Sequence, residues 1–583
     1  MLACVAGFFA AAVANAQELR LTPQNKKLAE DLFPEALVLQ VEEDATAADV
    51  IAAARGDYER LLAALYAEGY FSATISITLA GREAAALSAL RAPESVSPAI
   101  VSINTGAQFV YGTASIAPLA PNTTAGEDFQ PGEPAGTGDI RAAVEQAIDD
   151  WREASHAKAR VAAQEIIARH SDAELDVSLE VAPGPPLTFG RLVVPEDGAV
   201  RPGRLRTIAG LPSGQPFNPD ALVLARSRLV ATGAFNSVVL READEIGPGD
   251  TLDIGVEIED APPRRLGFGA EIETDEGIAV EAFWMHRNIF GGAENLRFDA
   301  AISGIAGRNG GPDFQVRGTL RIPGFRRADD TLVFTGNLES LNEPVFEEEL
   351  LEFGVRRARQ VNKELEIGVS LGVRISETTD DLGTRTFRHF IGNIDATRDR
   401  RDNVFNPKAG NFLFAQVQPF VGFSGSGTGV KLEGDARAYR SLGTRTVAAG
   451  RVRIGSIFGT EIIDTPSDFL FFSGGGGSVR GQRFQSLGVF DGTNTTGGRG
   501  FANVSLELRR DISRSFGVVG FVDYGFVSES GSFSDGGNHM GGGLGVRYNT
   551  ALGPLRLDVG VPIGGASDED TSYQLFIGLG QAF

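Results

Sequence analysis

The chain has 583 residues, more than one compact hydrophobic core usually serves, so several domains are expected. Its formal net charge is −23 and no stripe of clustered Lys and Arg is found, which argues against a surface that binds nucleic-acid phosphates. Glycine supplies 73 residues and charged residues 22%, a balance that fits neither a collagen-like chain nor an acidic disordered one. The chain should fold, and nucleic acid is not an expected partner.

Residues 1–16 are predicted to be a secretory signal peptide, because an apolar run ends in the small-x-small pattern Ala14-Asn15-Ala16. The missing basic region before this run indicates that the true start codon lies elsewhere. Cys4, the single cysteine, lies in this leader, so the mature chain would have no thiol, as suits an oxidising compartment. No later stretch reaches the roughly 18 to 20 apolar residues of a spanning helix, so a membrane role would use strands.

The first half contains an internal repeat of domain size. The pattern that begins Ile103-Asn-Thr-Gly106 recurs from Val181-Ala-Pro-Gly184, and a weaker copy begins at Ile258. The positions shared by the two clear copies are Ile103, Gly106, Phe109, Tyr111 and Gly112, and Val181, Gly184, Leu187, Phe189 and Gly190.

A second marker of the repeat lies where each predicted helix passes into a strand. Gly69 and Gly233 follow helical patterns at equivalent places, as left-handed stops, while Ser155 stands there in a degenerate middle copy. Such tandem units of helix and sheet resemble polypeptide-transport-associated (POTRA) domains, with predicted boundaries at residues 17–108, 109–186 and 187–261. The resemblance implies sheet edges that accept extended clients by strand addition, with inert spacers or docking modules as the alternative.

Residues 262–583 alternate between apolar and polar side chains, in segments separated by turns rich in Gly, Asp and Asn. In the clearest segment, the apolar alternates run from Leu365 to Ile375. Because a spanning strand takes about 9 to 11 residues plus a turn, this length predicts about sixteen antiparallel strands. The expected fold is therefore α+β repeats followed by an all-β transmembrane barrel.

A glycine run, Gly474–Gly481, carries one arginine late in this region. If the strands close into a barrel, this loop has to lie in the lumen, where Arg480 would seek a carboxylate on the inner wall. Asp523, in the segment Phe521-Val522-Asp523, is the best-placed candidate. Alanine at either position is expected to impair activity, and reversal of both charges to recover part of it.

The pairing of the loop Val479-Arg480-Gly481 with the wall residues Phe521 and Asp523 resembles the BamA/TamA outer-membrane protein assembly superfamily. The segments 284–294 and 399–410 resemble two of its turns, whereas Gln482 stands where the family usually has Phe or Tyr. Three tandem repeats resemble the TamA type.

That resemblance implies an assembly factor in the outer membrane of a Gram-negative bacterium, with its repeats in the periplasm. It would insert client barrels such as autotransporters, without nucleotide, metal or other cofactor. The implied partners are outer-membrane lipid, unfolded outer-membrane proteins and an inner-membrane-anchored TamB-like protein.

The mechanism expected on this basis uses a lateral seam between the first and the last strand, which must be paired yet able to open. Glycines are expected to weaken the seam, or alternatively to fit lumen packing or curvature. The seam residues predicted are Gly267, Gly269, Gly578, Gly580 and the final aromatic Phe583.

Other functions remain as alternatives. A two-partner-secretion-type exporter is the nearest, and a passive outer-membrane pore is the structural alternative. The motif Gly368-x-Ser370-x-Gly372 matches a hydrolase nucleophile elbow, but it lies inside uninterrupted strand alternation. The five histidines lack paired metal-binding spacing, so neither an enzyme nor a metal site is expected.

Overall fold

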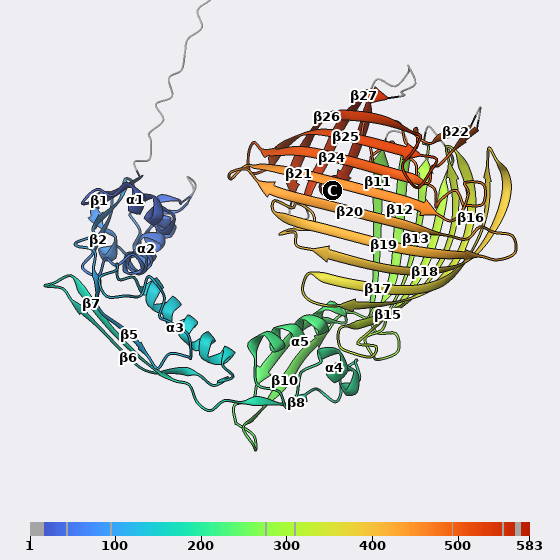
Figure 1. Cartoon of the computed structure of the whole chain (residues 1–583). Coiled ribbons are helices and arrows are strands. Elements are labelled where there is room, and N and C mark those ends of the chain that lie inside the picture. The colour runs from blue at the N-terminus through green and yellow to red at the C-terminus, as the bar shows by residue number, and fades with distance from the viewer. Residues whose placement is uncertain are drawn as a thin grey trace, which may run out of the picture. The chain divides into compact units, whose positions relative to one another are not determined.

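The computed structural model describes residues 17–41, 45–93, 96–273, 277–307, 310–491, 494–550, 553–565 and 573–583. The expected signal peptide, residues 1–16, lies outside the described residues, and so does Cys4. Three α/β units precede a closed β-barrel along the chain (Figure 1). None of the helices in the described ranges combines the length and the apolarity needed to cross a lipid bilayer.

The first unit packs one long helix, α2, on a four-stranded sheet of order β1-β4-β2-β3. A capping box starts α2: the Thr46 hydroxyl accepts a hydrogen bond from the Asp49 amide, and the Asp49 carboxylate accepts one from the Thr46 amide. Ile51 and Leu61 of this helix are buried against Ile77 of the sheet. The elements are β1 (Gln17–Thr22), α1 (Lys26–Leu32), η1 (Phe33–Glu35), η2 (Leu37–Leu39), α2 (Ala47–Ala67), β2 (Thr74–Leu79), β3 (Arg82–Glu83), η3 (Ala84–Ala86), η4 (Ala89–Arg91) and β4 (Ala99–Asn104).

The second and third units each have a three-stranded sheet, of order β5-β7-β6 and β8-β10-β9. In the second unit, α3 lies along one face of the sheet (Figure 1) and buries Ile140, Ala143 and Ala147. The elements of the second unit are β5 (Val110–Ala117), α3 (Thr137–Glu153), β6 (Arg160–Arg169) and β7 (Glu174–Ala182). Those of the third are β8 (Thr188–Val193), α4 (Pro202–Ala209), α5 (Pro219–Ala231), β9 (Phe235–Glu242) and β10 (Thr251–Asp260).

The same backbone conformation follows the long helix of each unit. Gly69, Ser155 and Gly233 have φ angles of 83°, 74° and 68°, the left-handed conformation that ends many helices. The carbonyls of Gly69 and Ser155 both accept a hydrogen bond at 2.9 Å, from the amides of Phe109 and Leu187. The middle copy of the repeat therefore keeps the backbone geometry although a serine replaces the glycine.

The barrel is a single antiparallel sheet that closes on itself (Figure 1). Within the described residues it has sixteen strands, which confirms the predicted fold class of α+β repeats followed by an all-β barrel. Its strands are β11 (Arg264–Glu273), β12 (Gly277–His286), β13 (Asn295–Ile305), β14 (Asp313–Pro323), β15 (Asp330–Glu343), β16 (Phe346–Gln360), β17 (Leu365–Asp380), β18 (Gly383–Asp399), β19 (Gly410–Gly422), β20 (Gly429–Ser441), β21 (Thr446–Phe458), β24 (Gly500–Asp511), β25 (Phe516–Ser528), β26 (Gly536–Thr550), β27 (Gly553–Gly565) and β28 (Gln574–Leu579).

Alternation along β17 illustrates how the sequence sets the two faces of the barrel. Val369 and Leu371 point outward and are 55% and 67% exposed, whereas Arg374 points into the lumen and is 1% exposed. An outward apolar face and an inward polar face are what a lipid-embedded barrel needs. Gly368 and Ser370 of the hydrolase-like motif lie inside this strand, so the sharp strand-to-helix turn of a nucleophile elbow is missing there.

Candidate functional site

A long loop, residues 459–499, lies between β21 and β24 and folds against the inner wall of the barrel. It contains a short hairpin of β22 (Val489–Asp491) and β23 (Asn494–Thr496). Phe469, Phe471 and Leu487 of this inward loop are buried against the wall residues Phe420 and Phe501. Apolar burial therefore holds the loop in the lumen, independently of its charged residues.

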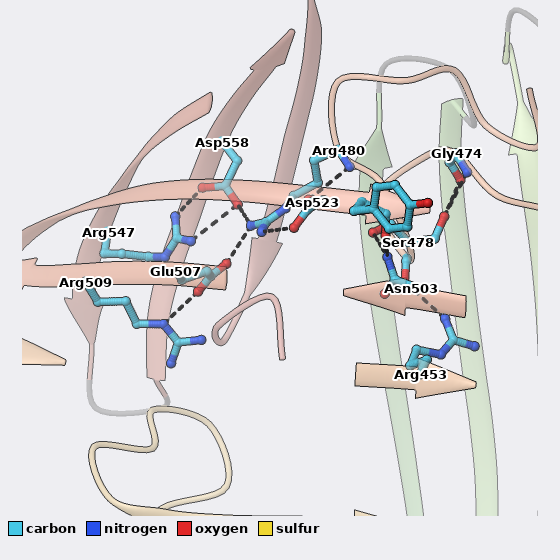
Figure 2. Close-up of polar contacts among 12 residues, drawn as sticks. Arg453, Gly474, Ser478, Arg480, Asn503, Glu507, Arg509, Asp523, Arg547 and Asp558 are labelled. Atoms are coloured by element: carbon cyan, nitrogen blue, oxygen red, sulfur yellow. Dashed lines mark hydrogen bonds and ion pairs between the residues drawn. The ribbon is translucent and has the colours of Figure 1, made fainter. Parts of the chain in front are cut away.

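Arg480 of the inward loop makes a two-pronged ion pair with Asp523 of β25 (Figure 2). Its Nε lies 2.8 Å from Asp523 Oδ2 and its Nη2 lies 3.0 Å from Oδ1, while its backbone amide donates to Oδ2 at 3.1 Å. The Arg480 guanidinium also lies over the ring of Phe521, with Cζ 3.7 Å from the ring centroid. The structure thus brings together the residues that the sequence placed in loop and wall.

Two further carboxylates contact the same guanidinium (Figure 2). Arg480 Nη1 lies 2.6 Å from Glu507 Oε1 on β24 and 3.3 Å from Asp558 Oδ2 on β27. Each of these carboxylates also binds a second arginine: Glu507 binds Arg509 at 2.7 Å, and Asp558 binds Arg547 at 2.5 Å. All six residues are at most 5% exposed.

These three arginines and three carboxylates form what we call the lumen cluster: Arg480, Arg509, Arg547, Glu507, Asp523 and Asp558. The formal charges of the cluster cancel, and each carboxylate is occupied by at least one guanidinium, which is the condition under which buried charges are tolerated. Within the described parts of the chain, no group of His, Cys, Asp and Glu is arranged to hold a metal ion.

Glycines let the backbone of the inward loop approach the wall closely. A Cβ atom at Gly541 of β26 would lie 1.9 Å from the Arg480 carbonyl oxygen, and one at Gly560 of β27 would lie 2.7 Å from the Gly481 amide nitrogen. Gly481 itself has a φ angle of 96°, which favours glycine. Val479, beside them, is fully buried. The loop therefore fits the wall through its backbone as well as through Arg480.

Gln482, which stands where the family that the sequence resembles usually has Phe or Tyr, fixes the loop by hydrogen bonds. Its Nε2 donates to the carbonyls of Met540 at 2.8 Å and Gly564 at 3.2 Å, and the residue is 2% exposed. Both carbonyls lie near the register shift between Met540 and Gly541 of β26, where carbonyls are left for a side chain to satisfy.

A second polar attachment holds the inward loop to β16 and β17. Arg374 Nη2 lies 2.5 Å from Glu348 Oε1 and 2.7 Å from Asp468 Oδ2 of the loop, and its guanidinium lies over the ring of Phe469. Arg374 and Glu348 are 1% and 2% exposed. The loop is thus tied to β16 and β17 by Asp468 and to β24, β25 and β27 by Arg480.

Pairing is short between the described residues of β11 and β28. Within the described residues, Glu273 and Phe576 are the one pair of partners there. By contrast, β11 is paired with β12 along its whole length, and β27 is paired with β28 from Leu555 to Gly560. The backbone edge of β11 from Arg264 to Ile272 therefore has no strand partner on the seam side in the part of the chain that the structure describes.

The chain after β28 leaves the barrel wall and turns inward. Gly580 has a φ angle of 88°, and its amide donates to the Pro554 carbonyl at 2.7 Å. Phe583 does not lie at the seam: it is 7% exposed and packs in the lumen against Tyr439, with Arg509 over its ring. The prediction that Phe583 is a seam residue is therefore wrong, because the left-handed turn at Gly580 directs the chain away from the strand.

Three of the predicted seam glycines leave space for side chains of the strand next to them. A Cβ at Gly267 would lie 2.2 Å from the Phe283 ring, and one at Gly269 would lie 2.5 Å from the Glu281 carboxylate, both on β12. Gly578 of β28 leaves space for Arg556 of β27. These contacts favour the alternative that the small residues accommodate packing.

Four residues of the lumen cluster were not singled out from the sequence: Glu507, Arg509, Arg547 and Asp558. A signal for them exists, because Leu506-Glu507-Leu508-Arg509 alternates outward leucines with inward charges. Alternation shows that such charges face the lumen, but it does not show which of the many lumenal charges meet. That selection depends on the strand register and on how far the loop reaches.

The architecture defines a β-barrel protein that carries tandem α/β units and an inward arginine loop. The chain belongs to the Omp85 superfamily, because the model of the Omp85 superfamily domain matches residues 288–583.

Similar proteins are found both by sequence and by fold. A SAM50-like protein of Schizosaccharomyces pombe is 25% identical over 366 residues, which cover 56% of this chain and 74% of that protein. The crystal structure of BamA from Haemophilus ducreyi lacking POTRA domains 1–3 has a TM-score of 0.62 at 15% identity, with 80% of this chain and 99% of that chain covered. CdiB from Acinetobacter baumannii has a TM-score of 0.50 at 14% identity, with 81% and 89% covered. At such identities, these two structures establish the likeness of the fold alone.

Proposed function

We propose that this protein inserts or folds client β-barrel proteins in the outer membrane, as a TamA-like assembly factor that works by strand pairing at its seam. The observation that carries the proposal is the edge of β11, which has a single partner pair with β28 among the described residues. Membership of a superfamily whose members assemble or secrete outer-membrane proteins supports the same direction.

Backbone physics explains why such an edge would act on clients. In the hydrocarbon layer, an N–H or C=O group without a partner costs several kcal/mol, roughly 2 to 7 for an amide, because water is absent. The open edge of β11 is therefore a strong acceptor for any strand that offers its own backbone. Since backbone groups are the same in all residues, this pairing needs no particular client sequence and no nucleotide.

A TamA-like role also assigns a location to the α/β units and partners to the protein. The three α/β units would lie in the periplasm of a Gram-negative bacterium and pass on extended clients, among them autotransporter barrels, with a TamB-like protein as partner. One open sheet edge is β6, which is paired on one side by β7 and exposes Ile166 and Ile167. The protein would work without enzymatic chemistry.

A second candidate is a two-partner-secretion-type exporter, which the barrel's likeness to CdiB favours. In such a protein the inward loop would have to leave the lumen so that a secreted chain could pass. The two attachments of the loop, at Arg480 and at Arg374, argue for a lumen that stays filled while the seam works. The difference is therefore one of route: through the lumen for an exporter, and along the seam for an assembly factor.

Reconstitution tests the proposal. The purified chain in liposomes should speed the insertion of an unfolded client barrel, measured by protease protection and by heat-modifiable mobility on gels, against empty liposomes and an unrelated barrel. Faster insertion without a lasting conductance would support the assembly factor. A steady ion conductance without faster insertion would contradict it and would favour a passive pore.

A further inference from the structure

The lumen cluster is connected to the chain segment that borders the seam. Residues 580–583, the inward tail, follow β28 and contact two arginines of the cluster. Arg509 Nη2 donates to the Phe583 carbonyl oxygen at 3.1 Å, and Arg547 Nε donates to Gln581 Oε1 at 2.8 Å. No other side chains of the cluster are recorded in contact with the tail among the described residues.

Each of these two arginines shares a different carboxylate with Arg480. On one route Glu507 uses Oε1 for Arg480 and Oε2 for Arg509, and on the other Asp558 uses Oδ2 for Arg480 and Oδ1 for Arg547 (Figure 2). Each route therefore runs from the loop arginine through one buried carboxylate to a second arginine and then to the tail. The two routes reach the tail at different residues, Phe583 and Gln581.

We propose that Arg509 and Arg547 are positioning residues that couple the inward loop to the tail, so that the loop must be seated for the seam to rest closed. With Arg480 in place, the charges of the cluster balance and both arginines are free to hold the tail by their remaining N–H groups. Without Arg480, three carboxylates face two guanidiniums, and Arg509 and Arg547 are drawn toward Asp523 and their own carboxylates. The tail then loses its two attachments to Arg509 and Arg547. These attachments lie next to the β28 edge, which has one recorded pair with β11 among the described residues.

The geometry of the tail favours such control. Besides the two arginines, it is held by three hydrogen bonds, from the Gly580 amide to the Pro554 carbonyl, from the Gln581 amide to the Phe405 carbonyl and from Gln581 Nε2 to Asn406 Oδ1. Coupling between two sites is reciprocal, so disturbing the tail arginines must also loosen the loop. The biological purpose of the coupling rests on the proposed function. The coupling itself is tested on the purified chain without a client protein.

Amide hydrogen exchange on the purified full chain in detergent tests the coupling. One peptide reports the tail through the Gly580 and Gln581 amides, and another reports the loop through the paired amides of Ser473 and Leu487. Arg480→Gln, which touches no tail residue, should raise exchange of the tail peptide by at least about fivefold, the lower end of typical couplings. The pair Arg509→Gln with Arg547→Gln should raise exchange of the loop peptide similarly.

Two controls keep the result interpretable. Arg510→Gln removes an exposed arginine from the opposite face of β24 and should change neither peptide. Gly541→Ala displaces the loop without altering any charge and should again expose the tail. The proposal is overturned if Arg480→Gln frees the loop peptide while tail exchange stays within twofold of wild type. It is equally overturned if amide exchange in β13 and β14 rises as much as exchange in the tail, because the variant would then loosen the whole barrel.

Discussion

At the scale of single residues, Arg480 decides whether three buried carboxylates are neutralised. Arg480→Ala would leave a buried charge without its partner, a change that typically costs about 3 to 5 kcal/mol. Arg480→Lys should recover part of this loss, because it keeps the charge but cannot form the two-pronged pair with Asp523. The temperature at which the heat-modifiable band unfolds in detergent should fall in the order wild type, Arg480→Lys, Arg480→Ala. Equal values for the three proteins would contradict this account of the cluster.

Because Arg480 contacts three carboxylates, the expected result of a charge-reversal experiment changes. A simple pair would be partly rescued by Arg480→Glu combined with Asp523→Arg, as the sequence led us to expect. In the structure, however, a carboxylate at position 480 would also face Glu507 and Asp558. We therefore expect the double reversal to unfold at no higher temperature than Arg480→Glu alone. Clear rescue would indicate that the contact with Asp523 dominates the cluster.

Close approach of the loop backbone to the wall gives a second prediction at this scale. Gly541→Ala would place a Cβ 1.9 Å from the Arg480 carbonyl oxygen, so the loop has to shift, whereas Gly520→Ala meets its nearest atom at 3.7 Å. A spin label at Gly477→Cys, an exposed loop position, should become more mobile in the Gly541→Ala protein and stay unchanged with Gly520→Ala. Equal mobility in both proteins would mean that the wall glycines do not hold the loop.

At the scale of elements, the stability of each α/β unit should depend on the left-handed residue that follows its long helix. Ser155 adopts the left-handed conformation that costs a non-glycine residue about 1 to 2 kcal/mol. Ser155→Gly should therefore stabilise the second unit and slow amide exchange in α3. The opposite change, Gly233→Ser, meets open space, and it should speed exchange in α5 through backbone strain alone. Exchange in α3 that is unaffected by Ser155→Gly would show that the strain is relieved elsewhere.

How far the sequence predicts each element depends on how local its signal is. Strand alternation such as that of β17 and the closure into about sixteen strands follow from local patterns, and the position of Arg480 in the lumen follows from closure. The inward turn at Gly580 could not be predicted, because a glycine near a strand end is equally compatible with a continuing strand. The sequence also could not predict that Arg480 shares Glu507 and Asp558 with other arginines, because this sharing depends on the register of four separate strands.

For the whole molecule, the central claim is that the seam opens to pair with a client strand. Among the described residues, opening the seam breaks one pair of partners, Glu273 and Phe576, whereas opening β15 from β16 would break pairing along the whole length of β15. Since each backbone hydrogen bond contributes about 0.5 to 1.5 kcal/mol net, the barrel should part at the seam first. The position of the opening is thus set by the register of the barrel.

A reversible lock of this seam tests the claim most directly. Glu273→Cys with Phe576→Cys places two thiols on paired positions, where an antiparallel register brings Cα atoms within disulfide reach. In liposomes, the oxidised protein should lose its acceleration of client-barrel insertion and regain it on reduction. A matched lock between β15 and β16, Thr335→Cys with Gly354→Cys, should leave insertion unchanged in either state. Full insertion activity with the seam oxidised would contradict the account.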